Sequence, residues 1–339
     1  PASKICAFIS FAPSRATEFI DFAPGLLVAY TLRMLVGIGL MLCYPQFITM
    51  VSDYTYKNDR GKGMAFNGIM MGLASIIIFA FIAQQAEAIG LSGLFALASI
   101  MAFAGVVFTC FCLKERRVES EHEDKKSILD ILKMVVKSPS LKASYLSTLI
   151  GRPDMSITSL FLIVWAVQAG AKLQMTSEAA TKAGAKPMIV MSIAAFFAMP
   201  LMGMMLDRWG RIQTIILTLL MGGIGLVLLG ISSGPFSTLA LVAAVLIGVG
   251  FAGAVTGTTT LATDASPKHL VGSVLGGLNT MMPIGLIFFQ QLGGYLFDVL
   301  GPGWIFSIKG VANILFAAWL FMGRKKIYAE IKSAAAKSG

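Results

Sequence analysis

Apolar stretches of about 20 or more residues constrain the fold of this chain more than any other feature. An apolar run of that length can cross a bilayer as a helix. We therefore predict an all-α, polytopic membrane helix bundle with about ten spans. The stretches lie at about 25–51, 63–86, 92–113, 143–168, 187–206, 212–231, 237–263, 270–297 and 303–323, after a shorter one at about 1–12.

The composition excludes other classes of protein. Only 13% of the 339 residues are charged and 56% are hydrophobic, whereas soluble chains are about 25% charged. A disordered chain is excluded as well, because this much apolar surface would not stay solvated. The cytoplasmic loops are too short for a catalytic domain and carry no catalytic constellation, so we predict no enzyme, no cofactor and no metal.

The positive charges lie mainly on one side of the predicted bundle. When the loops are assigned to alternate sides, 19 of the 27 lysines and arginines fall on one side and 4 on the other. Lysine and arginine accumulate in cytoplasmic loops. The net charge of +10 therefore indicates topology rather than nucleic-acid binding, and we predict a multi-pass protein of the cell (inner or plasma) membrane with a cytoplasmic C-terminus.

A charged segment divides the spans into two groups. Residues 114–142 begin with mixed charges and continue with an amphipathic pattern that is typical of an interfacial helix. We predict an N-terminal half at 1–113, this cytoplasmic linker at 114–142, a C-terminal half at 143–323 and a basic cytoplasmic tail at 324–339.

The two groups of spans resemble each other at an offset of 211 residues, which pairs Gly37 with Gly248 and Asp53 with Asp264. The matched positions keep a small-residue patch, an acid at the cytoplasmic helix end and a short basic loop. This internal repeat predicts two parallel halves. It also leaves the first half without two spans and part of a third, so we expect about 60–75 further residues upstream. A natural ten-span protein is the alternative.

The sharpest local motif joins two predicted spans on the cytoplasmic side. It reads Gly-x-x-x-Asp-Arg-x-Gly-Arg, with Asp264 at the cytoplasmic end of another span. We expect its glycine to allow close helix approach and its charged groups to form ion pairs across neighbouring helix ends. The predicted conformational latch consists of Gly203, Asp207, Arg208, Gly210, Arg211 and Asp264.

This loop resembles the signature of the major facilitator superfamily, as do the parallel halves, the charged linker and the internal C-terminus. A second family motif, Arg-x-x-Gln-Gly-x-Gly, is matched by Arg33, Gly37 and Gly39, with Val36 in place of glutamine. The proline signature of drug–proton antiporters is missing after Gly68. The resemblance implies six plus six spans and a substrate site near the middle of the membrane.

Charges inside apolar spans are costly unless they are paired or face a cavity. Arg33, Arg152 and Asp154 are embedded in this way, and Pro153 between the last two predicts a helix kink. Arg152 and Asp154 point about 200° apart on a helix, so we expect different partners for each. They serve substrate binding and coupling, or else structural pairing between helices. Lys309 is expected to extend its amine to the nearby membrane surface.

In the family that the chain resembles, spans one, four, seven and ten line the cavity. The resemblance therefore implies that the substrate or coupling candidates are Arg33, Arg152, Asp154, Thr256 and Thr259, with Asn67, Asn279 and Gln290 on neighbouring spans. A Gly-x-Gly-x-x-Gly pattern at Gly248, Gly250 and Gly253 lies inside an apolar span, so we assign it to helix packing rather than to dinucleotide binding.

The leading functional prediction is a monomeric secondary transporter that carries a small solute across the bilayer by alternating access. The two arginines favour an anionic metabolite, with protons as a candidate coupling ion through Asp154. An efflux antiporter for drug-like compounds and a non-transporting membrane sensor of the same fold are the alternatives.

Overall fold

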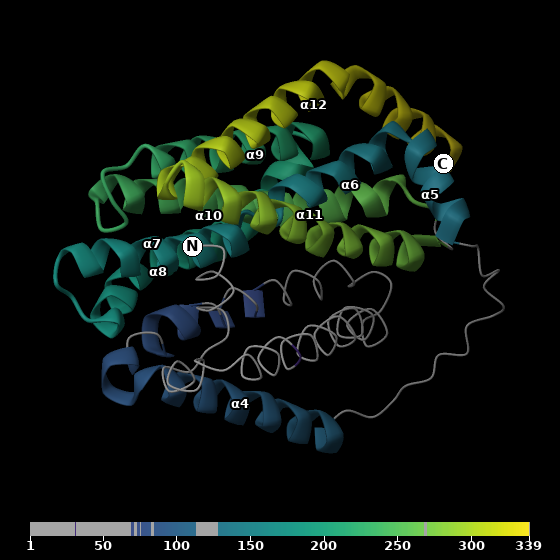
Figure 1. Ribbon diagram of the computed structural model, residues 1–339. Helices are drawn as coiled ribbons and strands as arrows, with labels where there is room; N and C mark the ends of the chain where they lie inside the picture. Colours follow the sequence, from purple (N-terminus) through teal and green to yellow (C-terminus); the bar gives the residue numbers. More distant parts are fainter. Residues whose placement is uncertain are drawn as a thin grey trace. The chain divides into compact units, whose positions relative to one another are not determined.

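The computed structural model describes residues 31, 69–70, 73–74, 76–82, 85–112, 128–267 and 270–338. All regular elements in these ranges are helical, which confirms the predicted all-α class. They are the π-helix η1 (Ile78–Ile82) and the α-helices α4 (Ala86–Cys112), α5 (Ile128–Lys137), α6 (Pro139–Gly151), α7 (Asp154–Lys172), α8 (Ser177–Arg208), α9 (Arg211–Gly230), α10 (Thr238–Ala265), α11 (Val271–Val299) and α12 (Pro302–Ser338) (Figure 1).

Within these ranges, six helical segments are long and apolar enough to cross a membrane. They correspond to the spans predicted between 143 and 323. The total of about ten spans remains a prediction, because most of 25–51 and part of 63–86 lie outside the described residues. The six segments are Pro139–Lys172, Ser177–Arg208, Arg211–Gly230, Thr238–Ala265, Val271–Val299 and Pro302–Glu330.

The chain forms two compact units. The first consists mainly of Ser3–Glu121 and Ile163–Lys186. In this unit α4 is kinked at Gly90, whose φ of 67° is a conformation that favours glycine. The end of α7 and the start of α8 pack closely here, since a Cβ on Gly184 would overlap the Cβ of Ala166.

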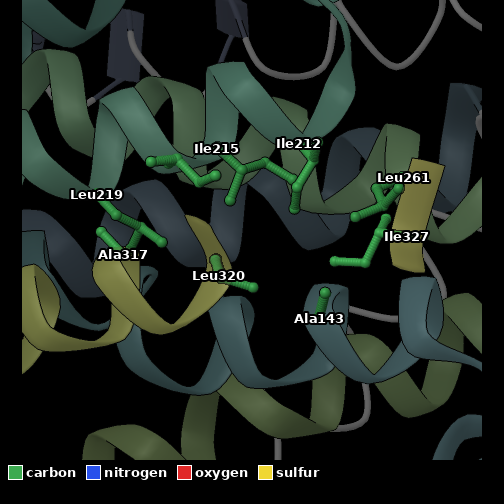
Figure 2. Packing of buried hydrophobic residues seen from close by; sticks show 9 residues of the cluster. Ala143, Ile212, Ile215, Leu219, Leu261, Ala317, Leu320 and Ile327 are labelled. Carbon is green, nitrogen blue, oxygen red and sulfur yellow. The ribbon is translucent and has the colours of Figure 1, made fainter. Parts of the chain in front are cut away.

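The second unit, mainly His122–Leu162 and Pro187–Gly339, holds the larger core. Helix α9 packs against α10 and α12, and α6 packs against α10, α11 and α12. Figure 2 shows one buried cluster in which α6, α9, α10 and α12 meet. Its labelled side chains are Ala143, Ile212, Ile215, Leu219, Leu261, Ala317, Leu320 and Ile327.

The three glycines of the Gly-x-Gly-x-x-Gly pattern all lie at helix contacts of α10. A Cβ on Gly250 would lie 2.6 Å from the Cα of Gly222 on α9, and one on Gly253 would overlap Thr218. A Cβ on Gly248 would overlap the carbonyl oxygen of Met191 on α8. Small residues allow backbones of membrane helices to approach closely, so the assignment of this pattern to helix packing is confirmed.

The end of the segment expected to be a linker forms the short helix α5. On one face of it Val135 is buried in a cluster with Leu141, Leu270 and Val274, whereas Leu132 and Val136 are exposed. Helix α6 then begins after Ser138, whose side chain accepts a bond from the amide of Leu141. An N-cap of this kind satisfies an otherwise unpaired helix donor.

Helix α12 continues beyond its predicted span, so residues 324–338, expected as a tail, are helical. Glu330 on this extension accepts hydrogen bonds from the backbone nitrogen and the hydroxyl of Ser140, at 2.8 and 2.6 Å. The carboxylate therefore lies at the N-terminus of α6, where the helix dipole favours negative charge. Figure 1 shows the C-terminal end of α12 near α5 and the start of α6.

Candidate functional site

A break between α6 and α7 positions the two embedded charges. Helix α6 ends at Gly151 and α7 begins at Asp154. Pro153 has no N–H to donate to the carbonyl oxygen of Leu149, which explains the interruption. Helix α11 approaches this carbonyl, because a Cβ on Gly285 would overlap its oxygen. The kink predicted at Pro153 is confirmed, and Arg152 and Asp154 contact different helices, as expected from their positions about 200° apart on a helix.

Arg152 contacts α10 and α11. Its side chain is buried, and its Nε and Nη2 donate to the hydroxyl of Thr258 at 3.1 and 2.8 Å. Nη2 also donates to the hydroxyl of Thr259 at 2.6 Å and to the carbonyl of Val255 at 3.2 Å. Nη1 donates to the side-chain oxygen of Asn279 at 3.1 Å. The structure thus brings together the predicted site residues Arg152, Thr259 and Asn279. These three residues and Thr258 are called the arginine cluster below.

Asp154 contacts α12 instead. Its Oδ1 lies 2.5 Å from the Nζ of Lys309, and its Oδ2 accepts a bond of 2.5 Å from the amide of Asn313. Lys309 also donates to the carbonyl of Ile150 at 2.6 Å and to Asn313 at 2.7 Å. All three side chains are buried. We call Asp154, Lys309 and Asn313 the ion-pair cluster.

The expectation for Lys309 is wrong. Its amine does not reach toward the membrane surface, because the residue is only 1% exposed and forms an ion pair with Asp154. Lys309 lies in the second turn of α12, which begins at Pro302. The ammonium is instead held by oxygen atoms of Ile150 on α6, Asp154 at the start of α7 and Asn313 on α12 itself.

In the described part of the chain, none of the remaining substrate candidates contacts the arginine cluster or the ion-pair cluster through a hydrogen bond of its side chain. The hydroxyl of Thr256 donates to the carbonyl of Ala252 in its own helix, at 2.8 Å. Gln290 is half-buried on α11, and the described part of the chain shows no hydrogen bond to its side chain. Arg33 and Asn67 lie outside the described residues.

The predicted latch loop forms an ion-pair bridge around Arg211. The guanidinium lies 2.6 Å from Asp207 on α8 and 2.9 Å from Asp264 on α10. It also donates to the carbonyl of Leu206 at 2.7 Å. Arg211 is the first residue of α9, so the bridge joins the ends of three helices. The side chain of Asp207 is 76% exposed, and exposed pairs contribute only about 0–1 kcal/mol each.

Two other residues of the motif behave differently from the expectation. Arg208 is exposed and makes no ion pair within the described ranges. A Cβ on Gly203 would meet no atom within 4 Å, so the close helix approach expected there is not found in the described part of the chain. Gly210 has a φ of 95° just before α9, which only glycine adopts without strain.

Asn313 is the functional candidate that sequence reasoning missed. It lies four residues after Lys309, so both side chains occupy one face of α12. Two polar residues at this spacing in an otherwise apolar span are a detectable signal, because each would be costly against lipid. The same argument would have identified Lys309 as an inward-facing residue.

Comparison with known proteins gives a consistent assignment. The sequence profile of the family described as the Major Facilitator Superfamily matches residues 5–185 and again residues 155–337. The magnetosome protein MamH of Paramagnetospirillum magneticum is 28% identical over 295 residues, which are 87% of this chain and 68% of MamH.

Two further relatives are magnetosome proteins named MamZ. The protein from Magnetospirillum gryphiswaldense is 28% identical over 306 residues, and the one from Paramagnetospirillum magneticum is 27% identical over 308 residues. The alignments cover 88% of this chain but 47% of each MamZ. The chain therefore spans about half the length of these relatives.

Proposed function

Since this chain belongs to the major facilitator superfamily of multi-pass membrane transporters, we propose that it is a secondary transporter that carries a small anionic solute by alternating access. The observation that carries the proposal is the buried guanidinium of Arg152, surrounded by hydroxyl and amide groups of α10 and α11. A planar guanidinium suits a carboxylate, which it can bind with two parallel hydrogen bonds.

The arginine cluster contains groups that a solute can replace. Thr259 and Asn279 are half-buried, whereas Thr258 is fully buried. We propose that a carboxylate takes over the bonds of Arg152 to Thr259 and Asn279, and that the bonds to Thr258 keep the guanidinium in place. The side-chain nitrogen of Asn279 then remains near the solute as a further hydrogen-bond donor.

For coupling, we propose that protons act through Asp154. A proton on this carboxyl would remove its negative charge and weaken the ion pair with Lys309. Contact between α7 and α12 then depends on whether the proton is bound. A change of protonation at this position would therefore be linked to helix rearrangement, which alternating access requires. The proposed partners are the solute, protons and the bilayer, with the protein acting as a monomer.

We further propose that residues 1–113 and 143–323 are two parallel halves with about ten spans between them, joined by the linker 114–142. The internal repeat and the matched family supply the support. The charge asymmetry favours a cytoplasmic C-terminus. We propose the cell membrane as the location, whereas the names of the relatives favour a role at the magnetosome. A fluorescent protein fused after residue 339 would distinguish these locations by microscopy.

The bridge around Arg211 supports a latch that holds the cytoplasmic helix ends together. Asp207→Asn should change the maximal transport rate by about two- to fivefold, which corresponds to the 0.5–1 kcal/mol of an exposed pair. Membrane insertion and thermal stability should stay near those of the wild type. Arg208→Gln is the matched control, because this neighbouring cation takes no part in the bridge. Equal rates for Asp207→Asn and wild type in vesicles would remove the latch role.

Counterflow into vesicles tests the transporter proposal directly. Vesicles that contain the purified protein and an excess of one unlabelled carboxylate should accumulate the same labelled carboxylate for a short time. A panel of small mono-, di- and tricarboxylates is compared with cationic and neutral drug-like compounds. Counterflow of the drug-like compounds alone favours the efflux alternative. No counterflow of any compound by a correctly folded protein favours the sensor alternative.

A further inference from the structure

The surroundings of the Lys309 ammonium have the composition of a cation site. Three oxygen atoms lie around Nζ: Oδ1 of Asp154 at 2.5 Å, the carbonyl of Ile150 at 2.6 Å and Oδ1 of Asn313 at 2.7 Å. The ring of Phe289 lies on another side, with its centroid 4.5 Å from the nitrogen. Carboxylate, carbonyl and amide oxygens are the ligands that hard metal cations take in proteins, and an aromatic face also attracts cations.

The charge of this group of ligands selects a monovalent ion. Asp154 supplies one negative charge, and Ile150 and Asn313 supply neutral oxygens. A single positive charge therefore makes the cluster neutral, whereas a divalent ion would leave an uncompensated charge in an apolar bundle. The amide nitrogen of Asn313 also donates to Oδ2 of Asp154, so Asn313 orients the carboxylate as well as binding the ammonium.

The oxygens are held by the fold and not by Lys309 alone. Ile150 lies beside the interruption that Pro153 imposes on α6 and α7. Gly222 of α9 packs beside the cluster, since a Cβ there would lie 3.7 Å from Oδ2 of Asp154, which is an ordinary van der Waals contact. Asp154 and Asn313 also bond to each other directly. Truncation of Lys309 to alanine would thus leave three converging oxygens and the space that three methylenes and the ammonium had filled.

We propose that Lys309 is a tethered occupant of a monovalent-cation site formed by Asp154, Ile150 and Asn313. The lysine supplies the positive charge that a free sodium, potassium or small alkylammonium ion would otherwise bring. It follows that the wild-type protein needs no free cation at this position. A variant with a short side chain at residue 309 acquires a dependence on one. This inference concerns the resting site and does not depend on the identity of the solute.

Thermal unfolding of the purified full chain tests the proposal. Lys309→Ala is measured in sodium, potassium and ethylammonium chloride and, at the same ionic strength, in choline chloride, whose cation is too large for the space. Sodium, potassium or ethylammonium should raise the unfolding midpoint of this variant by several degrees in a saturable way, as expected for an ion that binds only the folded state. The wild-type midpoint should be the same in all four salts.

The control is the double variant Asp154→Asn/Lys309→Ala, which lacks the negative charge and should show no difference between salts. Equal midpoints for Lys309→Ala in choline and in the three small cations would overturn the proposal. So would failure to recover Lys309→Ala in any salt under conditions that yield the double variant. Recovery of Lys309→Ala only when a small cation is present would support it. Because the measurement is stability, a failed transport proposal leaves its outcome unchanged.

Discussion

Asparagine in place of Asp154 is expected to lower the free energy of unfolding by about 3–5 kcal/mol, because the buried Lys309 ammonium would lose its counter-charge. The substitution preserves the shape of the side chain, so the loss reports on charge rather than on packing. If the carboxyl also carries the coupling proton, Asp154→Asn should abolish accumulation driven by a pH gradient. Exchange of solute at equal concentrations should persist.

A second substitution separates the two effects. Methionine at position 309 is apolar and close to lysine in length, so Asp154→Asn/Lys309→Met should recover most of the lost stability. It should not recover accumulation driven by a pH gradient. Thermal unfolding and vesicle uptake are measured on the same preparations. Wild-type accumulation by the double variant would show that Asp154 only balances the charge of Lys309.

Replacement of Arg152 by glutamine is expected to slow counterflow of the carried anion by about 10- to 150-fold at low solute concentration. This range corresponds to the 1.5–3 kcal/mol of a hydrogen bond to a charged group. Arg152→Lys should recover only part of the rate, because an ammonium cannot reproduce the planar fork that bonds Thr258, Thr259 and Asn279. The measurements are the KM and the maximal rate of counterflow.

Two threonines of α10 provide a matched control for this prediction. The hydroxyl of Thr259 accepts a bond from Arg152, whereas that of Thr256 bonds only within its own helix in the described part of the chain. Thr259→Val should therefore raise the KM severalfold, and Thr256→Val should leave it near the wild-type value. Equal KM values for both valine variants and for Arg152→Gln, in proteins with wild-type stability, would assign Arg152 a purely structural role.

The fold class and the six described spans could be predicted because membrane helices obey a simple rule. A helix must present about 20 apolar residues to cross the hydrocarbon region, and this length is visible in the sequence. Pro153 could be predicted to interrupt its helix for an equally local reason, since it lacks a donor. The packing of Gly250 against Gly222 also follows from composition, because glycine inside an apolar span is typical of helix contacts.

The partners of the buried charges could not be predicted in the same way. Asp154 and Lys309 are 155 residues apart in the chain, and no local spacing rule connects them. The sequence predicts that Lys309 reaches the surface, because its distance from the helix start is compatible with a snorkelling lysine. The rotation of α12 about its own axis decides the question, and that rotation depends on packing against α6 and α9.

The ion-pair cluster also has a consequence for biosynthesis. Asp154 emerges from the ribosome 155 residues before Lys309, and ribosomes add about 5–20 residues per second. For roughly 8–30 seconds the nascent chain therefore holds a carboxyl group whose final counter-charge has not been made. Glu330, which binds helix α6 at Ser140, is synthesised later still. Helix α6 can reach its final environment only after α12 has been translated, so assembly of this unit is completed after synthesis rather than helix by helix.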